Sequence, residues 1–385
     1  MNRPLRIAML THSTLPRGGV VHAMNLSEAL GALGAEVVLH APDAAGAGFF
    51  REAACQTRAF PVAPAPPDTL AMVERRIADY VDWLRPDENR GFDLYHAHDG
   101  ISGGALATLK RKGVIAGFVR TVHHVDAFAD PRLEAWQARS IREADALMTV
   151  SDLWRRRLRE DFGREAVICG NGVDLVRFSP GRDGVERLLR LRWRLGGGPV
   201  FLAVGGVEAR KNTLRMLAAF ASLVRELPTA RLVIAGGASL LDHSAYRSEF
   251  RAALAAMGAQ GAGVVLTGPL ADAEMPALYR RASALVFASV KEGFGLCVLE
   301  AMACGTPVVV SRIAPFVEYL GEADALFCDP LDPASIAAAM RTALDPVVAA
   351  RVRPRGLAVA ARHSWRAVAE RTLALYRRLR EPAYA

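Results

Sequence analysis

The sequence predicts an α/β protein with two doubly wound parallel sheets. Short runs that are apolar on both faces alternate with segments whose apolar residues recur at helical spacing, which is typical of parallel strands and their crossover helices. This alternation pauses over residues 180–198 and then restarts. The 385 residues therefore divide into two halves of ordinary domain size, each with its own sheet.

The first half opens as a βαβ unit, with a strand over residues 5–10, a turn containing Gly18 and Gly19, a helix and a second strand. Val21 and Met24 begin the helical spacing of apolar residues. Strands after the first are expected over residues 36–41, 92–98, 117–124, 146–151 and 166–174. Helices are expected over residues 20–34, 101–113, 133–144 and 152–163.

The second half restarts with a strand over residues 199–206. Further strands are expected over residues 231–237, 263–270, 284–289 and 307–311, and helices over residues 212–227, 248–258 and about 295–304. We assign residues 1–180 to an N-terminal domain and residues 181–363 to a C-terminal domain. A final helix at about 364–385 is expected to pack back on the N-terminal domain.

Composition and charge restrict the class of protein. Hydrophobic residues make up 51% and charged residues 23%, which is globular rather than disordered. No run of 18 or more uncharged apolar residues occurs, which excludes a transmembrane span, and the apolar N-terminal run is better explained by a strand than by a signal segment. Five scattered cysteines without a C-x-x-C pair favour neither a disulfide scaffold nor a zinc cluster. A cytoplasmic location is expected.

The net charge is +8, and only four of the 48 basic residues are lysines. Solubility is the simplest explanation, and an anionic partner such as a nucleotide, an acidic glycan or a membrane surface is the alternative. The segment WRRRLRE at 154–160 leaves peripheral contact with an acidic membrane open, although a solvated helix face explains it more simply. Nucleic-acid binding is not expected, because no basic stripe interleaves with aromatic residues.

The most specific pattern is KEGFGLCVLEAMACGTPVVVS at residues 291–311. Glu292 falls on a loop, where it can accept hydrogen bonds from sugar hydroxyls. Glu300 lies two turns into the expected helix, where it can accept two bonds from a vicinal diol such as a ribose. Gly305 is placed to end that helix, and its N-terminus offers free N–H groups to an anion. Two glutamates eight positions apart could, by themselves, be surface residues on an ordinary turn. The complete pattern around Glu292 and Glu300 disfavours that interpretation.

This segment resembles the retaining glycosyltransferases of family 4, the glycosyl transferase group 1 proteins, and the resemblance covers nearly the whole chain. It implies the GT-B fold, in which two Rossmann-like domains face each other across a cleft and hold a nucleotide-sugar donor. It also implies that the donor is a substrate and that neither a cofactor nor a metal is needed. Glu300 would then hold the ribose and Glu292 the donor sugar. Further donor contacts are implied for Gly293, Phe294, Gly295 and Leu296.

A second pattern, VGGVEARKNT, places Arg210 and Lys211 just before a helix for which Asn212 is the expected N-cap. A solvated basic turn is the alternative. In the family, a lysine here contacts the donor diphosphate. The family usually has arginine where this chain has Gly206, and we hypothesise that Arg17 replaces it.

The N-terminal half offers weaker signals. Gly18 and Gly19 open the first helix and match the family's loop that closes on the donor phosphate, although a plain tight turn explains them as well. His123 matches the family's histidine that faces the donor sugar. His98 and Asp99 are assigned to the acceptor side.

A metal site is one interpretation of the histidine-rich strand ends. The residues are His96, His98, His123 and His124 with Asp99 and Asp126. Ordinary polar residues at strand ends explain them more simply, so no metal is expected.

Asn171 to Asp174 resemble the family's N-G-V-D, with a turn and then a helix cap at Asp174. GPL at 268–270 falls where the family meets the base edge with backbone groups.

The function expected is transfer of a sugar, with retention, from a nucleotide-diphosphate sugar to an unidentified acceptor that is a small molecule, a lipid or a polysaccharide. His123, Lys211 and Glu292 are the expected catalytic residues. A sugar-nucleotide epimerase or phosphorylase on a similar fold is the rival enzyme. A catalytically silent relative that binds nucleotide or glycan is the rival of another class, and Gly206 is the residue that keeps it open.

Overall fold

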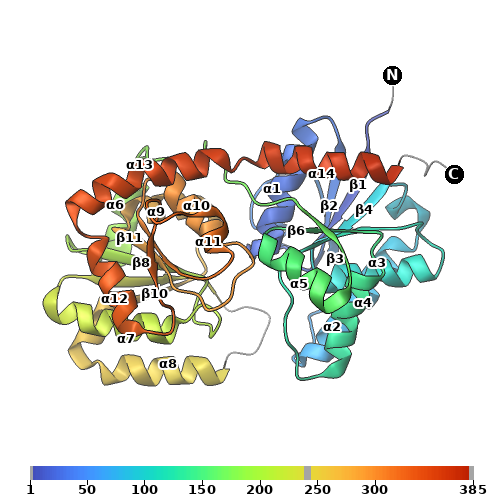
Figure 1. Cartoon of the computed structure of the whole chain (residues 1–385). Helices are drawn as coiled ribbons and strands as arrows, with labels where there is room; N and C mark the ends of the chain where they lie inside the picture. Colours follow the sequence, from blue (N-terminus) through green and yellow to red (C-terminus); the bar gives the residue numbers. More distant parts are fainter. Residues whose placement is uncertain (1–2, 238–243, 381–385) are drawn as a thin grey trace. The chain divides into compact units, whose positions relative to one another are not determined.

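The computed structural model describes residues 3–237 and 244–380, and the chain divides into two compact units (Figure 1). Unit 1 comprises Met1–Asn171 and Trp365–Ala385, and unit 2 comprises Gly172–Ser364. The part of the expected terminal segment that follows Arg380 lies outside the described residues. Each unit is built on a parallel sheet, so the predicted α/β fold with two Rossmann-like halves is confirmed.

Unit 1 has the strand order β3-β2-β1-β4-β5-β6-β7. The strands are β1 (Arg6–Leu10), β2 (Glu36–Asp43), β3 (Gln56–Pro61), β4 (Leu94–Ala97), β5 (Val119–Val122), β6 (Ala146–Thr149) and β7 (Ala166–Ile168). All neighbours pair in parallel; Ala8 of β1, for example, lies opposite Val38 of β2 and Tyr95 of β4. The carboxyl ends of these strands therefore share one edge, where ligands bind in open α/β sheets.

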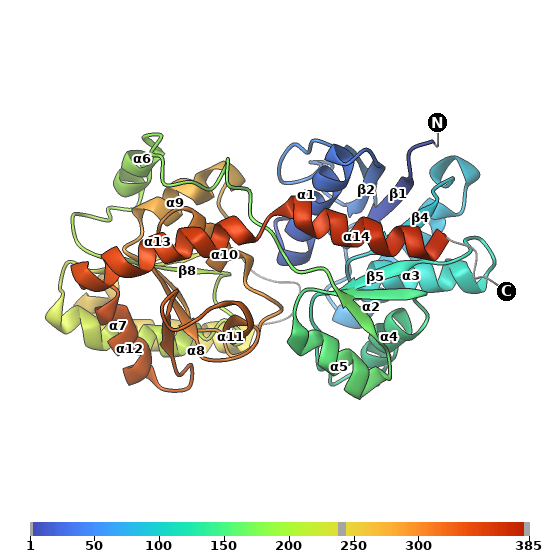
Figure 2. The same ribbon diagram turned by 45° about the horizontal axis from the view of Figure 1, so that its top comes forward.

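Three of the helices of unit 1 begin at an aspartate that caps them. The helices of this unit are α1 (Gly18–Ala32), α2 (Thr69–Leu84), α3 (Gly100–Arg111), α4 (Pro131–Arg142), α5 (Asp152–Phe162) and α14 (Trp365–Arg380). The side chains of Asp68, Asp99 and Asp130 accept backbone N–H bonds at the starts of α2, α3 and α4. Helix α14 packs along α1, which gives unit 1 a segment from the end of the chain (Figure 2).

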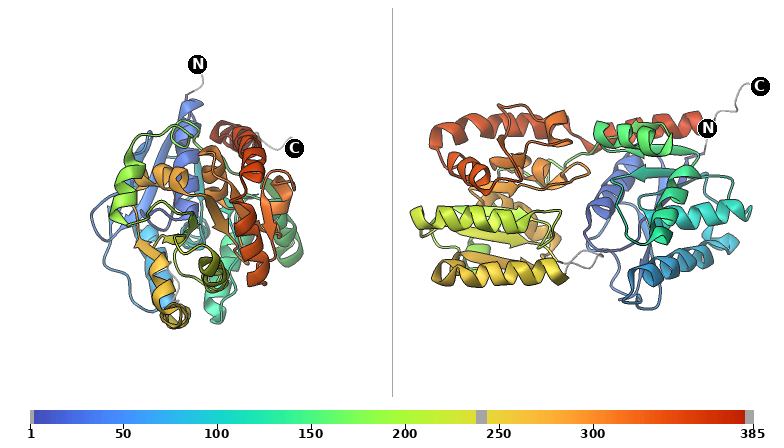
Figure 3. Two further views of the ribbon diagram at one scale, coloured as in Figure 1. Left: turned by 90° about the vertical axis from the view of Figure 1, so that its left-hand side faces the viewer. Right: turned by 60° about the horizontal axis from the view of Figure 1, so that its bottom comes forward.

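Unit 2 repeats the pattern with the strand order β10-β9-β8-β11-β12-β13. The strands are β8 (Val200–Val204), β9 (Arg231–Ala235), β10 (Val264–Gly268), β11 (Ala284–Phe287), β12 (Val308–Ser311) and β13 (Leu326–Cys328). The helices are α6 (Val185–Arg192), α7 (Thr213–Glu226), α8 (Ser244–Ala256), α9 (Met275–Arg281), α10 (Leu296–Ala303), α11 (Phe316–Tyr319), α12 (Pro333–Thr342) and α13 (Pro346–Arg362). Helices α7 and α8 lie side by side, and α13 packs on α10 (Figure 3).

Both cores are apolar, as continuous hydrophobic strands require. In unit 1 the ring of Tyr80 is fully buried, and its hydroxyl donates to the backbone oxygens of Thr11 and His40. In unit 2, Phe220 of α7 and Val286 of β11 are fully buried in the same cluster. None of the helices within residues 3–237 and 244–380 is long and apolar enough to cross a membrane.

The differences from the predicted elements lie where the sequence carries no strong period. The region 180–198, expected to be irregular, contains α6. Strand β3 and helix α2 fall in a stretch for which no element was predicted, and so do β13 and α11 to α13. The expected helix cap at Asp174 is wrong: its carboxylate accepts from the N–H groups of Val176 and Arg177 and closes a turn without a helix.

Candidate functional site

The site in unit 2 forms where two loops meet beyond the carboxyl ends of β8 and β11. One loop carries Arg210 and Lys211, and the other carries Glu292. The N–H of Val290 donates to the backbone oxygen of Arg210 at 3.0 Å, so the two loops are joined through their backbones. The charged side chains are thus held on backbone that is itself fixed.

Glu292 is the centre of this site. Its Oε1 accepts from Lys211 Nζ at 2.8 Å and from Arg210 Nη1 at 2.9 Å, and its side chain is 7% exposed. Burial alone would raise the pKa of Glu292, but the charges of Lys211 and Arg210 outweigh it and hold the pKa below its usual range. Glu292 is therefore an ionised, buried carboxylate and not a surface glutamate.

Lys211 reaches Glu292 because the strand end lacks a side chain. Gly205 has φ +122°, and a Cβ there would lie 2.5 Å from Lys211 Cε. The Lys211 ammonium also lies 4.4 Å from the centroid of the Phe287 ring, which adds a cation–π contact. Glycine at 205 is thus required by both the backbone and the lysine.

Gly206, where the resemblance described above implies an arginine, has surroundings that leave no room for a side chain. Its φ is +73°, and a Cβ would lie 2.5 Å from the carbonyl oxygen of Gly237. Gly236, which precedes Gly237 after β9, has φ +120° and would place a Cβ 2.9 Å from the N–H nitrogen of Gly206. The two glycine turns pack backbone to backbone, so a side chain at position 206 would require the turn at Gly236 and Gly237 to move.

Asn212 occupies the expected N-cap position of α7, but its side chain does not cap the helix. The amide instead donates to the backbone oxygens of Ala288 and Pro330 at 2.9 and 2.6 Å. The predicted capping bond is therefore wrong. Asn212 ties the loop of Lys211 to the end of β11, because two buried carbonyls need a donor there.

Glu300 lies on α10 with its carboxylate partly engaged. The hydroxyl of Tyr279 donates to Glu300 Oε2 at 2.6 Å. Burial raises the pKa of Glu300, and the Tyr279 hydrogen bond opposes that rise. One carboxylate oxygen is thereby fixed in direction, and the other can accept from a ligand hydroxyl.

The start of α10 is built on Phe294 and Gly295. The ring of Phe294 stacks on Tyr319 with centroids 4.6 Å apart, and the Tyr319 hydroxyl donates to the Phe294 oxygen. Gly295 has φ +96°, and a Cβ there would lie 2.7 Å from the ring of Phe316. The backbone from Gly293 to Leu296 is therefore fixed by aromatic packing beneath it. Helix α10 ends as predicted, with Gly305 at φ +74°.

The site in unit 1 is formed by histidines. A Cβ on Gly19 at the start of α1 would lie 3.4 Å from His123 Cδ2, so the glycine lets the helix approach that ring. His98 Nδ1 lies 3.3 Å from His123 Nε2. His22, one turn into α1, lies edge-on to His123 with ring centroids 4.7 Å apart. Three elements thus bring three imidazoles together.

The remaining polar residues of this edge have structural partners. Asp99 caps α3 and also accepts from the His12 N–H at 2.8 Å. His96 Nε2 pairs with Thr121 Oγ1 at 2.8 Å in the core. His124 lies outside the cluster, 42% exposed, and pairs with Asp126. The His96 ring also packs against His98, with centroids 4.4 Å apart, but both of its ring nitrogens are engaged by Tyr376 and Thr121. Among these four histidines, His98 and His123 are the pair that meets through ring nitrogens.

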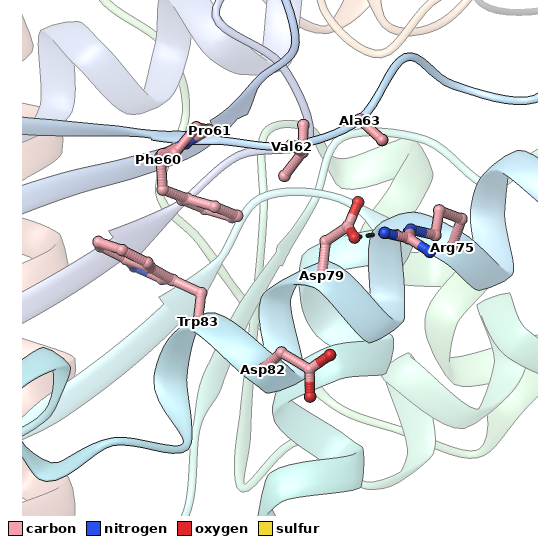
Figure 4. A pocket seen from close by; sticks show the side chains of 8 residues that line it. All are labelled: Phe60, Pro61, Val62, Ala63, Arg75, Asp79, Asp82 and Trp83. Carbon is pink, nitrogen blue, oxygen red and sulfur yellow. Dashed lines mark hydrogen bonds and ion pairs between the residues drawn. The ribbon is translucent and has the colours of Figure 1, made fainter.

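A groove of about 510 Å³ lies on unit 1 between the end of β3 and helix α2 (Figure 4). Phe60 and Trp83 stack at its wall with centroids 4.9 Å apart. Asp79, paired with Arg75, and Asp82 supply carboxylates. Aromatic faces beside carboxylates can contact a sugar ring and its hydroxyls. No sequence motif predicts this groove.

Sequence reasoning also missed His22, Tyr279 and Tyr319. His22 had one signal: it is a polar residue on the buried face of α1, which is apolar apart from His22 and Ser27. Tyr279 and Tyr319 are distant in sequence from the residues they hold, and nothing local marks them.

Known proteins match both halves of the chain. Residues 17–172 match the family described as "Glycosyl transferase 4-like domain", and residues 198–346 match "Glycosyl transferases group 1". The D-inositol 3-phosphate glycosyltransferase of Acidothermus cellulolyticus is 32% identical over 310 residues, which cover 74% of this chain and 67% of that protein.

Solved structures share the fold at lower identity. Sucrose-phosphate synthase from Thermosynechococcus elongatus gives a TM-score of 0.81 at 22% identity, covering 97% of this chain and 99% of that one. Anabaena HepE in complex with UDP and glucose gives a TM-score of 0.77 at 16% identity, covering 96% and 99%. The fold is therefore that of the GT-B glycosyltransferases. The chain belongs to the group 1 glycosyltransferases of family 4, and it is a transferase enzyme.

Proposed function

We propose that this enzyme moves a sugar from a nucleotide-diphosphate sugar to an acceptor with retention of anomeric configuration. The observation that supports this most is the buried Glu292, held between Lys211 and Arg210 beside Gly205, which lets the lysine side chain pass. Cations on rigid backbone suit a diphosphate, and a fixed carboxylate suits sugar hydroxyls. HepE, which shares the fold, was solved with UDP and glucose, so uridine is the first base to try.

Charge develops on the diphosphate as the bond to the sugar breaks. Lys211 and Arg210, together with the N–H groups at Gly18 and Gly19, are the groups proposed to stabilise it. Fixed donors act without reorganisation at the moment of reaction, and losing one typically costs about 3 kcal/mol, or a hundredfold in rate. Arg17 is proposed to supply the charge that Gly206 lacks; unchanged turnover and nucleotide affinity in Arg17→Ala would remove it from the mechanism.

Glu292 is proposed to position the donor sugar rather than to attack it. A carboxylate whose pKa is lowered by two cations is a poor base and a poor nucleophile. His123 is proposed to face the donor sugar, with His98 and Asp99 on the acceptor side. Retention then comes from reaction on one face of the sugar, and no metal takes part in that step.

Thermal shifts with UDP, GDP and ADP test the donor site. At a hundred times the dissociation constant, binding adds about 2.7 kcal/mol, which raises the midpoint by roughly two degrees or more. We expect one nucleotide to shift the wild type and to lose most of that shift in Glu300→Ala. Glu322→Ala, which removes an exposed carboxylate of unit 2, is the matched control and keeps the shift. If no nucleotide shifts the unfolding midpoint of the wild type, the proposed donor site is wrong. A catalytically silent member of the family then becomes the better interpretation.

A further inference from the structure

Unit 1 contains a cluster of three histidines, His22, His98 and His123, which the proposed transfer uses only in part. One ring nitrogen from each lies within 4.8 Å of the other two. His22 and His98 are buried, and His123 is partly buried. Within residues 3–237 and 244–380, no other group of three histidine, cysteine or carboxylate side chains converges in this way.

Hydrogen bonds on the outside of the cluster set the tautomers of two rings. His22 Nδ1 lies 2.7 Å from Asn171 Oδ1, which has no proton, so Nδ1–H donates and Nε2 carries the lone pair. His98 Nε2 lies against Met9 Sδ, which also has no proton, so the lone pair of His98 is on Nδ1. The buried Nε2 of His22 has no hydrogen-bond partner among the described residues.

The rings are neutral, which is the form that binds metals. Burial lowers the pKa of His22 to about 4, against a smaller opposite effect of Asn171. Burial also lowers the pKa of His98 and of His123 well below the usual range. Because the ring protons of His22 and His98 lie on the nitrogens that face Asn171 and Met9, the opposite nitrogens keep lone pairs for a metal ion.

We propose that His22, His98 and His123 form a binding site for one divalent transition-metal ion of the zinc class. His22 supplies Nε2 and His98 supplies Nδ1. His123 supplies Nε2 once the proton it shares with His98 has moved to its own Nδ1. Three imidazoles and one open position for water form a common zinc arrangement.

The surroundings fit this site. Ligand histidines almost always hold their other ring nitrogen on an acceptor, and Asn171 and Met9 are placed to do so. Zinc–nitrogen bonds of about 2.0–2.1 Å put ligand nitrogens about 3.4 Å apart, which is close to the 3.3 Å between His98 and His123. Only His22 must move closer. The start of α1 disfavours a cation, but this effect is small beside three coordinate bonds.

Competing sites are poor in the rest of the described chain. The five cysteines form no disulfide, and none of them belongs to a converging group of three ligand side chains within the described residues. Burial raises the pKa of Cys169 and Cys328 to about 12 and that of Cys55 to about 11, so these sulfurs stay protonated. Stoichiometric zinc binding would therefore report on the histidines.

Zinc binding to the untagged full chain tests the proposal directly, by competition with a chromogenic chelator. We expect one equivalent in the wild type. His22→Asn should lose it, and Asn171→Ala should weaken it by about 10- to 100-fold because the ring loses its anchor. His124→Asn, which removes the exposed neighbouring histidine, should bind as the wild type does. Circular dichroism of each variant checks the fold.

Cobalt added to the wild type gives a test that needs no variant. Four- or five-coordinate Co²⁺ bound to imidazoles absorbs visibly and intensely, and octahedral Co²⁺ in solvent does so weakly. An intense spectrum that zinc abolishes supports the site. Absence of stoichiometric binding, a weak octahedral spectrum, or equal binding by His22→Asn and the wild type would each overturn it.

A consequence for catalysis rests on the role proposed for His123. If His123 faces the donor sugar, the metal removes that ring from the donor, and zinc should inhibit transfer in competition with the nucleotide sugar. The binding experiments do not depend on activity. Stoichiometric binding without inhibition would therefore support the metal site and contradict the role of His123.

Discussion

The two units place different chemistry on the same scaffold. In both sheets the third, second, first, fourth, fifth and sixth strands lie in that order, and polar side chains gather where the strands end. Unit 2 places an ionised carboxylate, Glu292, between Lys211 and Arg210. Unit 1 places neutral histidines, His98 and His123, against each other.

The difference shows that a buried strand-end group keeps its charge only where partners of opposite charge outweigh burial. Burial disfavours the charged form of every group in both places. Glu292 stays ionised because two cations face it, whereas burial lowers the pKa of His98 and the neighbouring imidazoles lower it further, so His98 stays neutral. One sheet topology can therefore present an electrostatic site or a hydrogen-bonding and ligating one.

Removing the lysine should break the ionic site most severely. In Lys211→Met the stem remains over Phe287, but Glu292 keeps only Arg210, and the proposed diphosphate contact is lost. We expect kcat to fall by about 10²- to 10³-fold, the usual cost of one fixed donor. Steady-state kinetics with the nucleotide sugar found by thermal shift would measure it.

Lys112→Met is the matched control, because Lys112 is exposed at the end of α3 in unit 1. It should turn over as the wild type does. Equal losses in both variants, or none in Lys211→Met, would show that the ammonium of Lys211 does not act on the leaving group.

Restoring the family's arginine should destabilise unit 2. In Gly206→Arg the Cβ meets the Gly237 carbonyl, and φ +73° is strained for any side chain. A left-handed non-glycine residue costs about 1–3 kcal/mol before any overlap. We expect a midpoint several degrees lower and no gain in nucleotide affinity, measured by thermal unfolding with and without UDP.

Gly31→Arg provides the contrast, because Gly31 lies within α1 and a Cβ there meets no atom within 4 Å. Arginine is a better helix former than glycine, so stability should hold or rise by up to about 1 kcal/mol. A stable Gly206→Arg variant that binds nucleotide more tightly would contradict this expectation. It would show that the two glycine turns can separate and that the Gly237 carbonyl does not exclude a side chain at position 206.

The sequence was sufficient for the elements that frame both sites. Strands such as β8 and β11 are continuous apolar runs, and Gly305 marks the end of α10, so local composition decides them. The loops of Lys211 and Glu292 follow from those strands. Their sites at the carboxyl ends then follow from parallel topology.

What the sequence could not supply depends on contacts between distant residues. Asn212 looks like a cap, yet it bonds to Ala288 and Pro330, because buried carbonyls compete for its amide. His22 joins His98 only through packing of α1 on the sheet. Neither partner choice leaves a local pattern.

The smallest effect should come from the pH dependence of Glu300. Burial raises its pKa and the Tyr279 hydroxyl opposes that rise, so the carboxylate takes up a proton at a higher pH than an exposed glutamate does. The proposed ribose contacts use the ionised form, so nucleotide affinity should fall as pH decreases through that raised pKa, by at most about tenfold per unit. Tyr279→Phe removes a hydrogen bond to the charged form of Glu300, which raises the pKa further and moves the fall in nucleotide affinity to higher pH.

Calorimetric titration with UDP at several pH values measures the affinity. Glu300→Gln, which has no proton to gain, separates the titration of Glu300 from that of the phosphates. If Glu300→Gln shows the same pH dependence as the wild type, the carboxylate of Glu300 does not contact the ribose in its ionised form.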